Sequence, residues 1–256
     1  MFSRKERRNQ TIIHEDGHRG DGEAGSGPVP HEVVSPFPAN KGKRALTYDL
    51  MERVCEPSNL NRAYKRVKSN RGAPGIDGMT IETASQWIRT NKVGLIASLL
   101  DGSYIPSPIR GVGIPKPQGG IRELGIPTII DRIVQQAILQ VIEPIFEPTF
   151  SEHSYGFRPK RSAKDAVTQA RKYVEDGRTY VVDMDLEKFF DRVNHDILMS
   201  RLARHIGDKR LLTIIRRFLE AGMMKDGVVT ERTRGTPQGG PVTPRTQLTL
   251  FPCRLI

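Results

Sequence analysis

The chain has 256 residues, enough for one large domain or for one domain with an appendage. It carries 40 Lys and Arg against 29 Asp and Glu, a formal net charge of +11, so we expect a polyanionic partner such as RNA or DNA. The two cysteines are far apart, which excludes a disulfide framework and a cysteine-rich zinc site, and the apolar runs are too short to span a bilayer. These features predict a soluble cytoplasmic protein with no membrane partner.

Composition divides the chain into three regions. Residues 1–44 are rich in glycine, proline and charge and lack apolar periodicity, which predicts a disordered N-terminal tail. Residues 45–244 mix helical and strand periodicities, which predicts one folded domain of the α+β class. Residues 245–256 form a short C-terminal tail with a different pattern.

The folded region starts with two short helical patterns that end near residue 68. The second helix exposes basic residues and leads into a loop at 71–78 rich in turn-forming residues, whose backbone can approach a phosphate closely. A basic helix face usually means only solvation, and that alternative stays open. The cations that we predict to contact RNA here are Arg62, Lys65, Arg66 and Arg71.

A hairpin pattern follows at residues 109–126. Apolar residues alternate on both sides of Gln118-Gly119-Gly120, which is typical of a tight turn between antiparallel strands. Lys116 and Arg122 flank this turn, so both can project toward one anion, Lys as a point charge and Arg as a fork. Basic residues are also common on hairpin tips, so the pattern alone is weak.

Two helical patterns with capping boxes come next, beginning at Thr128 and Ser162. The second has an apolar stripe that we expect to be buried, formed by Ala163, Ala166, Val167, Ala170 and Val174. Between the two helices, aromatic and basic residues interleave at 153–161, a pattern that suits contact with a nucleic acid. A structured loop explains it equally well. The residues predicted to bind RNA here are Arg158, Lys160 and Arg161.

The stretch from Tyr180 to Leu186 alternates apolar and acidic residues, the period of a half-buried β-strand. Asp183 and Asp185 therefore fall on one face, where burial of two carboxylates is costly unless a cation compensates them. This favours a metal site, and Phe190 follows where it can pack against a bound substrate. Alternatively, the two aspartates cap the next helix or pair with surface arginines.

Two more helical patterns cover residues 197–219, and Asp226-Gly227 predicts a second hairpin turn. The chain then enters a glycine- and proline-rich turn at 235–241 that displays Gln238.

Five motifs, in this order, make the chain similar to the reverse transcriptases encoded by bacterial group II introns. Each motif alone is a weak signal, but five in one order are a strong one, and the resemblance runs from about Leu46 to Pro244. The motifs are RGAPGIDGMT at 71–80, IPKPQGGIRELGIPTIIDRIVQQA at 114–137, HSYGFRPKRSAKDAV at 153–167, VVDMDLEKFFDRVNHDIL at 181–198 and RGTPQGGPVTP at 234–244.

The resemblance implies a right-handed polymerase, here its fingers and an incomplete palm, with antiparallel strands packed against helices. It implies RNA-directed DNA synthesis, with an RNA template, intron RNA, a DNA primer and dNTPs as partners and Mg²⁺ as cofactor. Asp185 matches the catalytic, metal-binding aspartate, the backbone carbonyl of Leu186 is a further metal ligand, and Asp183 is a secondary candidate. The residues that match nucleotide-binding positions are Lys116, Arg122, Phe190 and Gln238.

The sequence departs from the family after Pro244. The family continues with an apolar helix and a strand turn with two adjacent aspartates, whereas residues 245–256 lack that helix pattern and the sequence has no Asp-Asp pair. We therefore expect a truncated polymerase that is inactive alone, unless a second polypeptide supplies the rest of the palm. Non-catalytic binding of intron RNA is the alternative. The acidic motif of a nucleotide-sugar transferase would explain Asp183 and Asp185 but none of the other four motifs.

Overall fold

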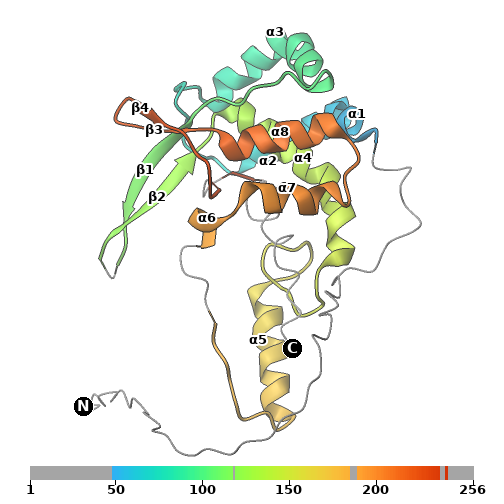
Figure 1. Cartoon of the computed structure of the whole chain (residues 1–256), viewed down its shortest axis with the longest axis vertical. Coiled ribbons are helices and arrows are strands. Elements are labelled where there is room, and N and C mark those ends of the chain that lie inside the picture. The colour runs from blue at the N-terminus through green and yellow to red at the C-terminus, as the bar shows by residue number, and fades with distance from the viewer. Residues whose placement is uncertain (1–47, 118, 185–188, 237–239, 242–256) are drawn as a thin grey trace, which may run out of the picture. The chain divides into compact units, whose positions relative to one another are not determined.

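The computed structural model describes residues 48–117, 119–184, 189–236 and 240–241. The chain divides into two units, residues 1–40 and 41–256, and every described residue belongs to the second (Figure 1). The predicted tails at 1–44 and 245–256 lie outside the described residues.

Among the described residues, the second unit contains eight α-helices and one short 3-10 helix (Figure 1). Their bounds are α1 Leu50–Cys55, α2 Pro57–Ser69, α3 Ile81–Leu100, α4 Ile129–Phe146, the 3-10 helix η2 Glu147–Thr149, α5 Ala163–Glu175, α6 Phe189–Arg192, α7 His195–Ala203 and α8 Lys209–Glu220.

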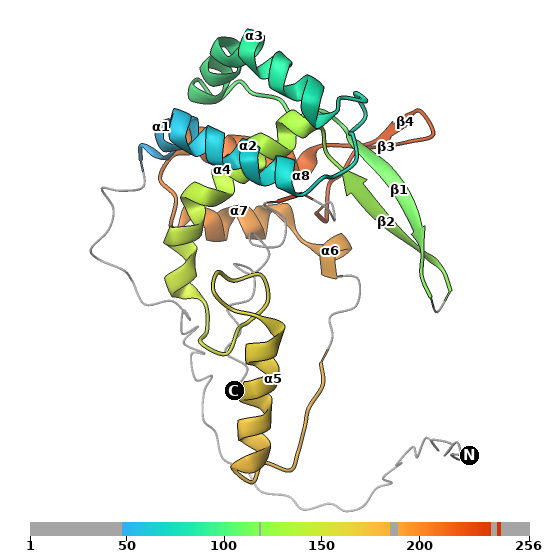
Figure 2. The ribbon, with the colours of Figure 1, turned by 180° about the vertical axis from the view of Figure 1, so that it is seen from behind.

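The core forms around α4. Most residues of this helix are buried, because apolar residues occupy most of its surface. Helices α1, α2 and α3 contact it, and Figure 2 shows α1 and α2 crossing it. Asn59 fixes the contact between α2 and α4, because its buried side-chain amide donates to the carbonyls of Val54 and Ala137 at 3.1 Å each. Gln140 of α4 returns a 2.8 Å hydrogen bond to the side-chain oxygen of Asn59. These bonds satisfy the polar atoms that the packing of α2 on α4 buries.

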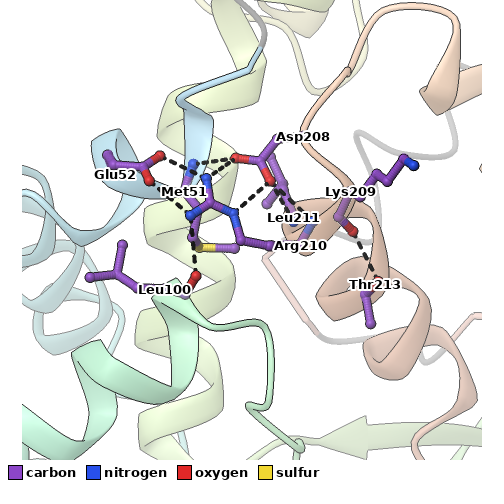
Figure 3. Close-up of polar contacts among 8 residues, drawn as sticks. All are labelled: Met51, Glu52, Leu100, Asp208, Lys209, Arg210, Leu211 and Thr213. Atoms are coloured by element: carbon purple, nitrogen blue, oxygen red, sulfur yellow. Dashed lines mark hydrogen bonds and ion pairs between the residues drawn. The ribbon is translucent and has the colours of Figure 1, made fainter.

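Arg210 ties α8 to two earlier helices (Figure 3). Its two terminal nitrogens donate to the carboxylate of Glu52 in α1 at 2.8 and 2.9 Å, and one of them reaches the carbonyl of Leu100 at the end of α3. Its guanidinium also bonds Asp208, which caps α8 and accepts a 3.0 Å hydrogen bond from the backbone amide of Met51. A planar guanidinium suits this role because it donates in several directions at once.

The sheet has four strands in the order β2-β1-β3-β4. The bounds are β1 Ile109–Pro115, β2 Ile121–Ile126, β3 Met223–Lys225 and β4 Val228–Thr230. Both predicted hairpins are confirmed, because β1 pairs with β2 and β3 with β4 in antiparallel fashion. Asp226 and Gly227 have φ of 51° and 81°, as a two-residue hairpin turn with a left-handed backbone demands.

The α+β class is confirmed, but the sheet is mixed and not purely antiparallel. Ile109 pairs with Met223 in parallel register, so β3 joins β1 beside the first hairpin. The helices between β2 and β3 provide the long crossover that a parallel pair needs. Local patterns in each hairpin carry no information about this pairing.

The predicted strand from Tyr180 to Leu186 is wrong for its described part. Residues 178–184 have no regular secondary structure and pair with none of the described strands. The side chains of Tyr180 and Val182 are 94% and 81% exposed. An alternating pattern becomes a half-buried strand only when a neighbouring strand satisfies its backbone and covers one face.

The apolar stripe predicted for the helix after Ser162 is also not buried. The capping box is present, since Ser162 and Asp165 exchange hydrogen bonds at the start of α5. However, no residue of α5 is buried, and Val167 and Val174 are 69% and 64% exposed. The capping box and the helical periodicity are local signals that favour α5, whereas its apolar face has no covering element among the described residues. Among all the described residues, no helix is long and apolar enough to cross a bilayer.

Candidate nucleotide and nucleic-acid site

The free end of the β1–β2 hairpin presents Lys116 and Arg122. Arg122 stands opposite Ile114 in the strand register, and Lys116 continues the ladder through its amide, which donates to the carbonyl of Gly120 at 3.0 Å. Lys116 follows Ile114 by two positions, so both cations lie on the same face as Ile114, one diagonal step apart. Both residues are exposed. The register therefore brings together the two cations predicted to hold an anion.

The predicted metal site is described only in part. Asp183 is exposed and lies in the irregular segment 178–184. Asp185 and Leu186 lie outside the described residues. Across the described ranges, no group of three or more acidic, histidine or cysteine side chains gathers as a metal-binding cluster would. The described part of the predicted site contributes only the Asp183 carboxylate, and Mg²⁺ needs further oxygen ligands to fill its octahedral shell.

Phe190 lies in α6 and is half-buried. Its backbone carbonyl accepts a 2.7 Å hydrogen bond from the amide of Thr236, the residue before the part of the predicted turn that lies outside the described residues. Gln238 itself lies outside the described residues. The structure therefore brings the segment after the acidic motif next to the start of the predicted nucleotide-binding turn.

The loop at 72–78 is held against the start of α4 by an arginine. Arg132 donates to the carbonyl of Ala73 at 2.7 Å, and Gly72 lies so close that a Cβ there would be 2.3 Å from the guanidinium. A Cβ on Gly75 would be 2.6 Å from the Cα of Thr128, so the loop backbone packs directly on the helix start. Burial lowers the pKa of Arg132, and the nearby Asp77 carboxylate opposes that shift.

This loop forms one wall of an open pocket of about 630 Å³. Glycines 75 and 78 of the loop, residues 110–113 of β1 and residues 224–227 of the β3–β4 hairpin line it. Arg110 and Lys225 contribute positive charge, although Arg110 also donates to the carbonyl of Pro74 and Lys225 pairs with Glu123. Its walls are rich in glycine, so a ligand can approach the backbone closely.

The basic face of α2 is exposed as predicted. Arg62, Lys65 and Arg66 lie on one helix and are all exposed, and Arg71 follows in the loop with a φ of 47°. Arg62 also donates a 2.9 Å hydrogen bond to the side chain of Asn59, so its guanidinium is partly oriented. These cations form a surface next to the loop at 72–78.

The three basic residues between η2 and α5 have different environments. Arg158 is largely buried, with a side chain 7% exposed, and pairs with Glu147 at 2.8 Å while donating to the carbonyls of Ser151 and Ser154. It holds the loop together, which supports the structured-loop alternative at this position. Arg161 donates to the carbonyl of Glu152, and its guanidinium lies over the ring of Tyr155. Lys160 is exposed, with a φ of 58°.

Two residues that organise the site were not singled out from the sequence. Arg132 fixes the loop at 72–78, and His195 places its Nε2 2.6 Å from the carbonyl of Gly235. Both bond backbone carbonyls far away along the chain. No residue pattern predicts which backbone carbonyl a side chain will bond. The only signal in the sequence is that Arg132 and His195 lie inside the motifs at 114–137 and 181–198.

Comparison with known proteins assigns the family. A family model described as "Reverse transcriptase (RNA-dependent DNA polymerase)" matches residues 114–249, more than half of the chain. This match rules out the nucleotide-sugar transferase alternative. Protein YkfC of Escherichia coli (strain K12) is 38% identical over 201 residues, covering 76% of this chain and 53% of YkfC.

Group II intron proteins are also among the relatives. The group II intron-encoded protein LtrA of Lactococcus lactis subsp. cremoris is 34% identical over 196 residues, covering 76% of this chain and 32% of LtrA. The chain thus spans about half of YkfC and a third of LtrA. The solved "Partial Cas6-RT-Cas1--Cas2 complex" aligns with a TM-score of 0.54 and 23% identity over 78% of this chain and 33% of that one, a likeness of fold. This chain belongs to the reverse transcriptase family and is a relative of the group II intron-encoded proteins.

Proposed function

We propose that the chain binds an RNA template, a DNA primer and an incoming dNTP as the fingers and part of the palm of a group II intron reverse transcriptase. The observation that carries this proposal is the placement of Lys116 and Arg122 on one face at the free end of the β1–β2 hairpin. Two cations one diagonal step apart suit a triphosphate, which presents several anionic oxygens in a row. In the proposed complex, Phe190 packs under the sugar and Gln238 lines the nucleotide site.

The metal site belongs to the same proposal. Asp185 is the proposed catalytic residue and Mg²⁺ ligand, the carbonyl of Leu186 is a second ligand, and Asp183 is a secondary candidate. Carboxylate and carbonyl oxygens are the ligands that Mg²⁺ takes in proteins. When bound, Mg²⁺ would lower the charge on the triphosphate and activate the primer hydroxyl.

The RNA-binding surface of the proposal combines the α2 cations with the loop that follows them. Arg62, Lys65, Arg66 and Arg71 are exposed, and the net charge of +11 favours a polyanion. Intron RNA is the proposed natural ligand of this surface. Lys160 extends the proposal to the loop before α5, and Arg158 and Arg161 contribute there through the shape of the loop that they hold.

Two further points accompany the proposal. The exposed side chains at 180–184 support a second polypeptide that pairs with this segment. The cysteine usage supports a reducing, cytoplasmic location, since Cys55 is free and buried.

Filter binding to single-stranded RNA over a series of salt concentrations tests the proposal. Each phosphate contact contributes about 0.7 to the slope of log K against log salt for a single strand. The double variant Lys65→Gln/Arg66→Gln should therefore flatten the slope by about 1.4, whereas Lys116→Gln/Arg122→Gln should leave the slope unchanged and weaken dNTP binding to a template–primer duplex. The charge-matched control is Arg89→Gln/Lys92→Gln, which removes two exposed cations of α3 and should change neither. A flat salt response of the parent chain, or a control that changes either measurement as much as the other variants do, would refute the proposal.

A further inference from the structure

The segment that contains Phe190 is joined by backbone hydrogen bonds to residues 234–236. Besides the bond from Thr236 to Phe190, the amide of Gly235 donates to the carbonyl of Val193 at 2.8 Å. Asn194 and Arg234 form an antiparallel bridge between the same two segments. Residues 190–194 and 234–236 therefore lie side by side over their whole length, although about 40 positions separate them in sequence.

Gly235 is required at this contact for two reasons. Its φ is 80°, in the left-handed region that favours glycine. A Cβ at this position would also lie 2.9 Å from the carbonyl oxygen of Asp191 and 3.0 Å from that of Phe190. The backbones thus meet with no side chain between them, and the carbonyl of Gly235 has a fixed direction.

His195 lies at the end of that direction. It is the first residue of α7 and is 4% exposed, with its Nε2 2.6 Å from the carbonyl oxygen of Gly235. A carbonyl only accepts hydrogen bonds, so Nε2 carries the proton and donates. Leaving a buried carbonyl without a hydrogen-bond donor costs free energy of folding. The bond from His195 therefore holds the carbonyl side of Gly235, while the bond to Val193 holds its amide.

We propose that His195 is a positioning residue that fixes Gly235 and Thr236 and, through the Thr236 amide, holds the backbone of Phe190. In the proposed complex Phe190 packs under the sugar, so the height of its ring limits the space for a hydroxyl at the 2′ position. His195 therefore sets sugar selectivity without touching the nucleotide. This inference rests on the proposed function for the role of Phe190, but the positioning itself is measurable without any nucleotide.

The first measurement is amide hydrogen exchange of the full-length chain. His195→Leu should speed exchange at Gly235 and Thr236 by about tenfold or more, because the Gly235 carbonyl, which shares a peptide plane with the Thr236 amide, is released and Gly235 itself is less constrained. His195→Gln keeps a donor at nearly the same distance and should restore protection. Gly235→Ala disrupts the same contact, because its Cβ would clash with the carbonyls of Asp191 and Phe190, and it should speed exchange as His195→Leu does. Unchanged exchange at both amides in His195→Leu would overturn the proposal.

The second measurement is the ratio of the Kd values for GTP and dGTP in a ternary complex with an RNA template, a chain-terminated DNA primer and Mg²⁺. His195→Leu should lower this ratio by about fivefold and His195→Gln by less than about twofold. The structural control is Asn194→Ala, which removes the cap of α7 but leaves the histidine in place, and should lower the melting temperature without changing the ratio. An equal change of the ratio in Asn194→Ala, or an unchanged ratio in His195→Leu, would overturn the proposal.

The two measurements separate this inference from the proposed function. A parent chain that binds neither nucleotide would refute the proposed function. The exchange rates at Gly235 and Thr236 would then still decide whether His195 positions these residues.

Discussion

The hydroxyl of Tyr104 donates a 2.7 Å hydrogen bond to the carboxylate of Asp131, which joins the loop after α3 to the first turn of α4. Asp131 is 1% exposed and also accepts from the hydroxyl of Thr128 at 2.6 Å and the amide of Ser107 at 3.2 Å. Burial raises the pKa of Asp131, and the hydrogen bonds from Thr128 and Tyr104 only partly offset that shift. The first turn of α4 therefore contains a buried carboxylate whose oxygens need these hydrogen bonds.

Tyr104→Phe should lower the free energy of unfolding by about 1–2 kcal/mol, because it removes one of these donors. The folded pKa of Asp131 lies above its unfolded value, so the carboxyl favours folding at low pH and this contribution is lost as the pH rises through the folded pKa. The lost bond stabilised the charged form, so the cost of Tyr104→Phe should increase as the pH rises through the raised folded pKa of Asp131. Urea denaturation at several pH values measures it. Tyr64→Phe, on α2 and also packed against the core, is the control, and a cost independent of pH would contradict the expectation.

Arg210→Met should destabilise the protein by about 2 kcal/mol at neutral pH, because it leaves the buried carboxylate of Asp208 without its cation. The hydrogen bond from Arg210 lowers the pKa of Glu52. Burial alone would raise the pKa of Asp208, but Arg210 and backbone amides lower it on balance. Carboxyls with lowered folded pKa values stabilise above their unfolded values, near pH 4, and lose this contribution as the pH falls. The cost of Arg210→Met should therefore shrink in acid.

The control for this experiment is Arg216→Met on the same helix. Arg216 pairs with Asp196 and Glu220, whose side chains are 78% and 46% exposed. Exposed pairs contribute about 0–1 kcal/mol, so the control should have a small effect. Denaturation of both variants between pH 3 and pH 7 measures the two effects. Equal losses of stability in the two variants would contradict the role given to the ion pairs of Arg210 with Glu52 and Asp208.

Arg132→Met should weaken RNA binding by about tenfold without changing the slope of affinity against salt. Arg132 bonds the carbonyl of Ala73 and holds the loop, so its loss should disorder a binding surface but remove no phosphate contact. Arg71→Gln should instead flatten the slope by about 0.7, since Arg71 is exposed and proposed to bind phosphate directly. Filter binding gives both slopes, and hydrogen exchange should show the loop at 72–78 opening in Arg132→Met alone. A flattened slope in Arg132→Met would mean that it contacts RNA itself.

Val167→Glu should reduce self-association of the chain. Val167 is 69% exposed on α5, and it belongs to an apolar stripe that no described element covers. Because the side chain is exposed, the free energy of unfolding should change by no more than about 0.5 kcal/mol. Thr168→Glu adds the same charge one position away and is the matched control. Sedimentation velocity at several concentrations distinguishes the two, and equal effects would show that charge alone controls association.

The elements that sequence patterns predicted correctly are those whose signals are local. The cap at Thr128 and the apolar stripe that follows determine α4, and the glycines after Gln118 determine the first hairpin. The segment at 180–184 and the stripe of α5 were assigned to the core from the same kind of pattern. Burial, however, requires a partner surface, and periodicity describes only one side of that contact.

The candidate site divides in the same way. Lys116 and Arg122 can be placed on one face from strand alternation alone, so their proximity was predictable. The contacts of Arg132 with Ala73 and of His195 with Gly235 were not, because a backbone carbonyl accepts a donor whatever its own residue type is.

The parallel pairing of Ile109 with Met223 has a consequence for synthesis on the ribosome. Strand β1 leaves the exit tunnel long before β3 is translated, so the first hairpin must wait with one edge open while the intervening helices emerge. Co-translational folding can then assemble the helices around α4 first and add β3 last. Until translation reaches the second hairpin, the open edge of β1 is exposed to pairing with other chains, which favours aggregation.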